Sequence, residues 1–233
     1  SSRFSRLWLD NQDEPALDPL SSALNVSLKF DQLDADGWLA WWQGIWQKTG
    51  DAALNSAGHW LPAQTNLQLQ AKQLTWAGQP WDQGSLKLHQ QGETGQLSLL
   101  ANQVAGTLAW QPQRPLAIEL SRLHWRTADD EEEAPKPQSL LPVAEQQRLL
   151  AAIPDFDFHC QRCQLDEAML GEVKVTGRVT PTALRVPEFS LQSGENRVSG
   201  QGSWQIVGGE GRSDLKLSLQ LASVETWLRD WNY

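Results

Sequence analysis

The chain carries nearly the same passage twice, once near each end. Residues 24–42 read LNVSLKFDQLDADGWLAWW, and residues 215–231 read LKLSLQLASVETWLRDW. In both passages four apolar residues alternate with polar ones, and an acidic residue, a Trp-Leu pair and a further Trp follow. Because the copies lie about 190 residues apart, we read the chain as one full period and the start of the next. A repeat that cannot bury its apolar face alone is stabilised by stacking on neighbouring repeats. We therefore expect this chain to be a segment of a longer protein.

Alternation of apolar and polar residues continues between the two passages. Leu86 and Leu88, for example, alternate with polar neighbours and therefore share one face of a strand. Turn residues such as Gly78-Gln79-Pro80 separate the short segments. Frequent strands with little helix are typical of a mostly β, antiparallel structure that has one apolar and one polar face. The strands expected in the first half are 24–30, 65–76, 84–91, 95–102, 104–110 and 116–125, and residues 156–221 repeat the pattern.

The second half of the chain resembles the first segment by segment. Residues 171–179 resemble 84–92, residues 189–204 resemble 97–110, and residues 214–221 resemble 115–123. These matches indicate two half-units of about 90 residues. We expect an irregular lead-in at 1–23, a first β half-unit at 24–127, an acidic loop or linker at 128–139, and a second half-unit at 140–233 that includes the start of the next repeat.

Each half-unit contains one candidate amphipathic helix. Trp38, Leu39, Trp41, Trp42, Ile45 and Trp46 recur at three- and four-residue steps, which predicts a Trp-rich helix over 36–48. Residues 140–153 predict a second helix that Pro154 ends. The Trp-rich helix either packs onto the end or edge of a sheet or contacts a lipid chain or membrane interface. The sequence leaves both roles open.

Composition and motifs argue against several classes of function. The net charge is −9, which disfavours nucleic acid and anionic lipid surfaces as electrostatic partners. Nucleophile elbows, zinc-protease motifs, P-loops and dinucleotide fingerprints are missing from the sequence, and the four histidines lie far apart. We therefore expect no enzyme activity, no cofactor and no metal site. The sequence also lacks a run of apolar residues long enough to span a membrane.

Cys160 and Cys163 form a single C-x-x-C. A thioredoxin-type redox motif would open a helix after a buried strand, whereas the surrounding residues here are mostly polar. A zinc site would require about four ligands, and only His159 is adjacent. Two interpretations of the cysteine pair remain, a short-range disulfide and two inert thiols. Residues three apart in a regular strand point to opposite faces, so a bridge would require a turn or bulge.

Short strands bounded by glycines and ending in G-x-G-x-W form a recurring sequence pattern. It is clearest in residues 170–204, LGEVKVTGRVTPTALRVPEFSLQSGENRVSGQGSW. It resembles the AsmA-like superfamily of Gram-negative envelope proteins, and within it the YhdP family. The resemblance covers residues 24–233. It implies a long curved β-sheet that forms an open groove in the periplasm. It also implies a parent protein anchored in the inner membrane by a helix outside this segment.

The resemblance further implies a role in phospholipid traffic towards the outer membrane, with acyl chains held in the groove and neighbouring repeats of the same parent chain as partners. The apolar face could instead close on itself as a barrel or sandwich. The alternative functions are therefore a structural or protein-interaction β-module and, less simply, a glycan-binding domain with exposed tryptophans such as Trp110 and Trp204. Groove-lining candidates are Leu67, Leu69, Leu86, Leu88, Leu97, Leu99, Leu116, Ile118, Leu120, Val173, Val175, Phe189, Leu191, Leu215, Leu217 and Leu219.

Overall fold

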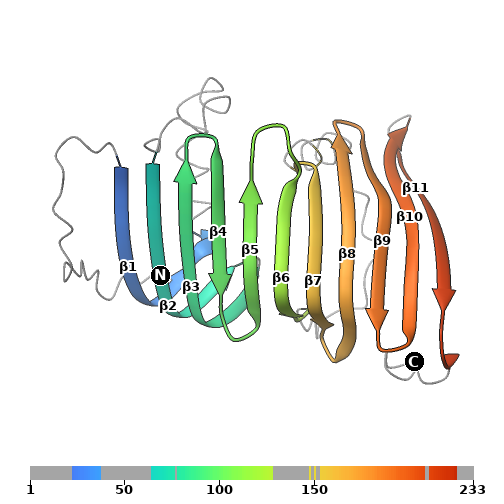
Figure 1. Cartoon of the computed structure of the whole chain (residues 1–233), viewed down its shortest axis with the longest axis horizontal. Coiled ribbons are helices and arrows are strands. Elements are labelled where there is room, and N and C mark those ends of the chain that lie inside the picture. The colour runs from blue at the N-terminus through green and yellow to red at the C-terminus, as the bar shows by residue number, and fades with distance from the viewer. Residues whose placement is uncertain are drawn as a thin grey trace. The chain divides into compact units, whose positions relative to one another are not determined.

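The computed structural model describes residues 23–37, 64–76, 78–127, 147, 150, 153–207 and 210–224. Nearly all of these residues lie in strands (Figure 1). The strands are β1 Ala23–Asp34, β2 Gln64–Trp76, β3 Gln79–Gln91, β4 Thr94–Leu100, β5 Val104–Trp110, β6 Leu116–Trp125, β7 Phe156–Leu165, β8 Ala168–Thr180, β9 Ala183–Ser193, β10 Asn196–Val207 and β11 Glu210–Gln220.

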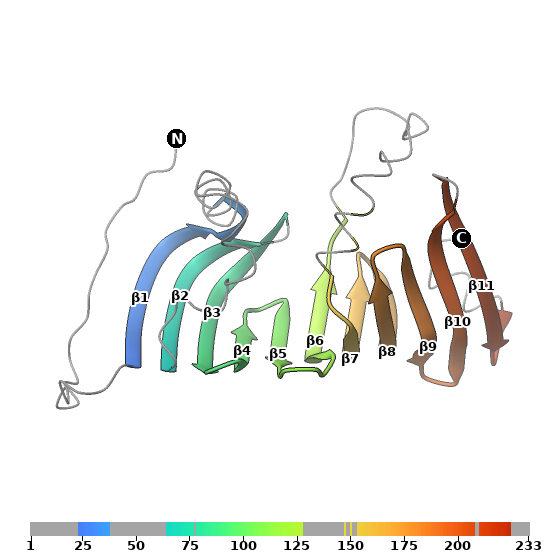
Figure 2. The same cartoon turned by 90° about the horizontal axis from the view of Figure 1, so that it is seen from above.

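The chain divides into two compact units, Ser1–Gln113 and Arg114–Tyr233. In the first unit β1 to β5 are neighbours in chain order, and in the second unit β6 to β11 are neighbours in chain order. Within each unit the sheet is open, because the described strands at the two ends of the run do not pair with each other. The expected mostly β, open-sheet fold is therefore confirmed. Figure 2 shows that β1, β2 and β3 curve along their length.

One pair of strands in each unit departs from the expected antiparallel arrangement. β1 pairs with β2 in parallel, and β6 pairs with β7 in parallel. The other neighbouring strands described within each unit pair antiparallel. Parallel neighbours require a crossover of a dozen or more residues, which a hairpin turn cannot provide. Residues 35–63 and 126–155 are long enough to be these crossovers.

The crossovers contain both predicted helices. Residues 36 and 37 are helical, as are residues 147 and 150, and the rest of 36–48 and most of 140–153 lie outside the described residues. The acidic stretch at 128–139 also lies outside them. The compact units divide between Gln113 and Arg114, and β6 lies in the second unit with its parallel partner β7. The half-unit boundaries expected from the sequence stay a prediction.

The two units share an interruption in their strand pairing, which we call the kink. In the first unit, the pairing of β2 with β1 and with β3 omits Lys72, and Gln83 opposite it has a φ of 54°. Ala71 and Leu74, three residues apart, are both buried there. In the second unit, Cys160 and Cys163 are likewise both buried, and the register of β7 with β8 shifts between them. In the second unit the shift is a bulge, which lets side chains three residues apart share a face. In the first unit the pairing is interrupted at Lys72 without a change of register.

A small closed core lies in the first unit. Its most deeply buried apolar side chains are Leu74, Trp81, Leu99, Ala101 and Val104. The indole Nε1 of Trp81 donates a hydrogen bond to the carbonyl oxygen of Trp76 at 2.9 Å. The backbone N of Asn102 donates to the carbonyl oxygen of Asp82 at 3.1 Å, which holds the turn between β4 and β5 against β3.

Candidate functional site

The strand register of the first unit joins apolar side chains into rows that cross the strands. Residues directly opposite each other on neighbouring strands project from the same face of a sheet. Two such apolar rows therefore run across β1 to β5 on one face. One row is Val26, Leu67, Leu88, Leu97 and Leu108, and the other is Leu28, Leu69, Leu86, Leu99 and Gly106.

The second unit has two corresponding rows across β6 to β11. One row is Ile118, Phe158, Val175, Phe189, Gly200 and Leu217, and the other is Leu120, Cys160, Val173, Leu191, Val198 and Leu219. The remaining candidates adjoin these rows: Leu116 pairs with Phe156 on β7, and Leu215 pairs with Gly202 on β10. The register therefore brings all of the sequence-predicted lining residues onto the apolar faces of their own units.

The apolar rows are accessible along most of their length. Among the predicted lining residues, Leu99 and Leu120 are buried, with 3% and 7% of their surface exposed. On β11, by contrast, Leu215, Leu217 and Leu219 are exposed. The other eleven are partly exposed: Leu67, Leu69, Leu86, Leu88, Leu97, Leu116, Ile118, Val173, Val175, Phe189 and Leu191. A face of this kind can take up an apolar ligand without unfolding.

A hollow also opens in the first unit at the kink. It has a volume of about 750 Å³, and its lining includes Phe30 of β1, Ala71 of β2 and Gly84 of β3. These three residues are paired across the strands and stand on the face of the apolar rows. Ala71 and Gly84 are buried, and the other lining residues are polar or charged, namely Lys29, Asp31, Gln70, Lys72, Gln83 and Ser85. The hollow is therefore mostly polar and is not part of the apolar rows.

Glycines make room for large rings on the apolar faces. A Cβ atom at Gly95 would meet the ring of Trp110 on the neighbouring strand, and one at Gly177 would meet Phe156. Phe189 covers Gly200 in the same way. Glycine in a strand allows such close cross-strand approach because it has no side chain of its own. Each of these aromatic rings therefore lies over a glycine of the neighbouring strand.

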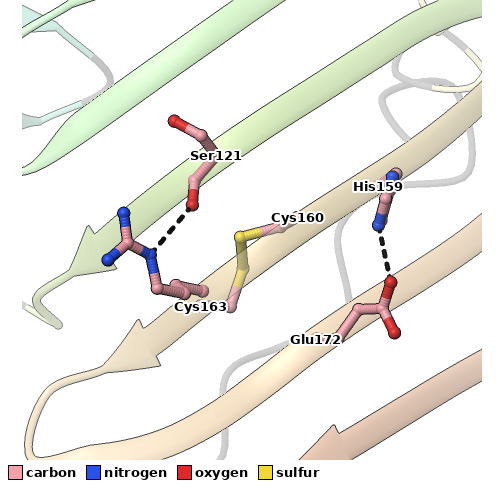
Figure 3. The surroundings of a disulfide bond; sticks show 6 residues. Ser121, His159, Cys160, Cys163 and Glu172 are labelled. Carbon is pink, nitrogen blue, oxygen red and sulfur yellow. Dashed lines mark hydrogen bonds and ion pairs between the residues drawn. A yellow bond between two sulfur atoms is a disulfide. The ribbon is translucent and has the colours of Figure 1, made fainter.

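The C-x-x-C forms a disulfide within the second unit. Cys160 and Cys163 are bridged, with their Cα atoms 5.9 Å apart (Figure 3). Cys160 pairs with Leu120 and Val173, so the bridge is part of an apolar row. The bulge between the two cysteines supplies the departure from a regular strand that such a bridge requires.

A charged cluster lies beside the disulfide on neighbouring residues of the same strands. The ring of His159 lies 2.9 Å from Oε2 of Glu119. It also lies 2.8 Å from Oε1 of Glu172 (Figure 3). The ammonium of Lys174 lies 2.8 Å from the same Glu172 oxygen. Hydrogen bonds from Lys174 and His159 hold the pKa of Glu172 below its usual value. The polar face therefore carries ion pairs directly behind the apolar row.

Sequence reasoning missed several members of the rows and two residues beside them on the same faces, Phe30 and Phe156. Val26, Leu28 and Phe30 had the correct alternation, and Phe156 and Phe158 alternate in the same way, but none was named as lining. Alternation assigns a residue to a face of its own strand and says nothing about which strands are neighbours. The parallel partners β1 and β7 entered the rows only through the register.

The described ranges hold no group of three His, Cys, Asp or Glu side chains arranged as metal ligands. Among the described residues there is no helix that is long and apolar enough to cross a bilayer.

Neither the curated proteins nor the solved structures include a significant match to this chain. The model of the family described as YhdP protein matches residues 3–233, which is nearly the whole chain. The chain therefore belongs to the YhdP family, a bacterial cell-envelope family.

Proposed function

We propose that this chain is a segment of a periplasmic bridge-like lipid transport protein that moves phospholipid between the inner and outer membranes. The parent protein would be anchored in the inner membrane outside this segment. Membership of the YhdP family supports this proposal, as does the apolar face of each unit. The observation that carries it is the continuity of the accessible apolar rows across neighbouring strands.

The mechanism is shielding of acyl chains from water. Each methylene removed from water contributes about 0.8 kcal/mol, so a long acyl chain gains ample free energy from an apolar trough. Neighbouring strands lie about 4.8 Å apart, so a row across five strands is roughly 19 Å long. An acyl chain that follows a row therefore lies across the strands, with its head group in water at the open side.

The composition of the rows suits movement along them. Leu, Val, Ile and Phe interact with a methylene chain through non-directional contacts, which do not favour one position strongly over the next. The charged cluster of Glu119, His159, Glu172 and Lys174 stands on strand positions that alternate with the row and does not interrupt it. No chemical step is part of this function, so we propose a non-enzymatic role.

The principal alternative is a structural or protein-interaction β-module without lipid cargo. The closed core around Leu74 and Trp81, which are each 1% exposed, favours this alternative for one end of the first unit. The two functions differ in whether the rows outside that core hold lipid. A measurement of bound lipid on the folded chain decides between them.

The test is native mass spectrometry with lipid extraction on the chain purified from the periplasm without detergent. The proposal expects co-purified phospholipid that is lost in Leu97→Asp and in Ile118→Asp. Ser98→Asp is the matched control, because Ser98 is the next residue on β4 and pairs with Lys87 and Thr107. Each variant is compared by circular dichroism to establish that it is folded. A folded, monodisperse wild-type chain without lipid would favour the structural module.

A further inference from the structure

The second unit contains a bulge that the first unit lacks. It lies in β9, between β8 and β10 (Figure 1), where Pro187 and Glu188 stand opposite the single residue Gln201 of β10. The register of β9 with β8 shifts at the same place, so Pro187 has no paired residue on either neighbouring strand. β4 occupies the corresponding place in the first unit and pairs with both neighbours without a shift. The repeat fold therefore does not require this bulge, and bulges often re-aim side chains beside binding sites.

A hollow of about 300 Å³ opens beside the bulge. Its lining includes Val186 and Pro187 of the bulge itself. It also includes six polar side chains that stand, by their register, on the polar face of the second unit: Arg185, Gln201, Ser203, Gln205, Asp214 and Lys216. Four of the six come from β9 and β10, which have neighbouring strands on both sides. The hollow is therefore built mainly by interior strands of the sheet.

Arg185 carries a charge that no described neighbour balances. It stands directly opposite Arg178 of β8. Arg178 has its own partners, because its guanidinium lies 3.0 Å from the Asp157 carboxylate and donates to the carbonyl oxygens of Phe156 and Gly177. Arg185 takes part in no hydrogen bond or ion pair with the residues that the structure describes. Like charges directly opposite each other destabilise a sheet, so the packing of the strands does not explain a cationic group at this position.

Hydrogen-bond donors reach the hollow from three neighbouring strands. Arg185 comes from β9, Ser203 from β10 and Lys216 from β11. Nε2 of Gln205 donates to Oγ of Ser203 at 3.4 Å, which leaves the hydroxyl hydrogen of Ser203 available to a ligand. Two cations against the single carboxylate of Asp214 give the lining a net charge of +1. The hollow therefore suits a small anion that accepts hydrogen bonds from several directions.

We propose that this hollow binds a phosphate group, carried either by a free phosphate ester or by a lipid head group. The exposed oxygens of a phosphate monoester can accept hydrogen bonds from donors on three strands, whereas a carboxylate offers two oxygens. The Arg185 guanidinium binds two of these oxygens through its planar fork, and the Lys216 ammonium binds as a point charge. The site lies on the polar face of the second unit, so it is separate from the acyl-chain rows of the proposed function.

The test titrates the whole isotope-labelled chain with inorganic phosphate at fixed pH and ionic strength and follows the backbone amide chemical shifts. Saturable shifts are expected in residues 185–188 and 201–205. Arg185→Gln should weaken phosphate binding by about tenfold, the usual effect of removing a charge-assisted hydrogen bond. Arg197→Gln is the matched control, because it removes a cation from the polar face of β10 outside the hollow. It should leave phosphate binding unchanged.

Stability separates this role of Arg185 from a structural one. Arg185→Gln removes no described contact and relieves the repulsion from Arg178, so its urea midpoint should be unchanged or higher. A clearly lower urea midpoint would show that the Arg185 charge is used within the fold, and it would overturn the proposal. Asp214→Asn should tighten phosphate binding by about twofold or more, because it removes the carboxylate from the lining.

The source of the phosphate is decided with two further probes, glycerol 3-phosphate and vesicles of phosphatidylglycerol. Saturable shifts of the same amides with the soluble ester support the proposal and assign the site to a free phosphate ester. Binding to the vesicles that is lost in Arg185→Gln supports it and assigns the site to a lipid head group. The proposal would be overturned if none of the three probes bound saturably, or if Arg197→Gln weakened binding as much as Arg185→Gln.

Discussion

Cys160 and Cys163 are three residues apart on β7, yet their sulfur atoms are joined on the buried face of one sheet. In a regular strand these side chains would point to opposite faces. The register shift of β7 against β8 places the extra residue of a bulge between them. In the first unit Ala71 and Leu74 are buried at the corresponding kink without any cysteine. The kink is therefore a property of the repeat, and the disulfide secures one copy of it.

This relationship predicts the outcome of replacing the disulfide with the residues of the first unit. The Cys160→Ala, Cys163→Leu variant should keep its β-structure by circular dichroism, because hydrogen bonding to β6 and β8 maintains the kink. Its free energy of unfolding should fall by about 2 kcal/mol, the loop-closure contribution of so short a ring. Urea unfolding measures the loss. Loss of the folded state in the double variant would show that the kink requires the bridge.

The closed core and the accessible rows should respond differently to truncation. Trp81→Ala should lower the free energy of unfolding by about 3–5 kcal/mol, because it removes a fully buried ring. Leu88→Ala should cost roughly 1–2 kcal/mol, because Leu88 is partly exposed in the folded chain. Urea unfolding of both variants provides the comparison. Equal losses would indicate that the row at Leu88 is as closed as the core.

The approach of Trp110 to Gly95 predicts a strong dependence on the missing Cβ. Gly95→Ala should lower the free energy of unfolding by about 1–3 kcal/mol, because the new methyl group overlaps the indole ring. The same change in a Trp110→Leu background should cost clearly less, since a smaller side chain leaves room. A double-mutant cycle from urea unfolding measures this coupling. Additive effects would mean that the ring does not cover the glycine.

The Asp166 carboxylate predicts a contribution to stability at neutral and mildly acidic pH. Hydrogen bonds from the Thr127 hydroxyl and backbone N, both at 2.7 Å, lower its pKa below 3.8. A lowered folded-state pKa gives stability that is present above the unfolded value and is lost as the pH falls through the folded value. Asp166→Asn should therefore flatten the acid limb of the stability profile. Glu167→Gln, at the next residue, is the matched control, and an equal flattening in it would contradict this assignment.

The sequence predicted the strands and their apolar faces well because alternation is a local property. Leu86 and Leu88 share a face whatever strands lie beside them. It did not predict the parallel pairing of β1 with β2, because that choice depends on the path of the long crossover. It also did not place Phe158 opposite Ile118, since that contact exists only once β6 and β7 are neighbours.

The cysteine pair shows a second limit of sequence reasoning. The requirement for a bulge followed from the spacing of Cys160 and Cys163, but the spacing alone could not decide between a bridge and two thiols. The structure places the bulge in the register of β7 with β8. The roles of the Trp-rich helix at 36–48 and of the linker at 128–139 stay predictions, because those residues lie almost entirely outside the described ranges.

The central claim is that the apolar rows hold acyl chains, and site-specific photo-crosslinking in the periplasm tests it most directly. A benzophenone amino acid is placed at Leu67, Leu88 or Leu97 of one row, and at Gln68, Lys87 or Ser98 of the opposite face on the same strands. Each product is analysed for covalently attached phospholipid. The account predicts phospholipid adducts at all three row positions and none at the opposite-face positions. Equal labelling of both faces, or no adduct at any row position in the folded chain, would contradict it.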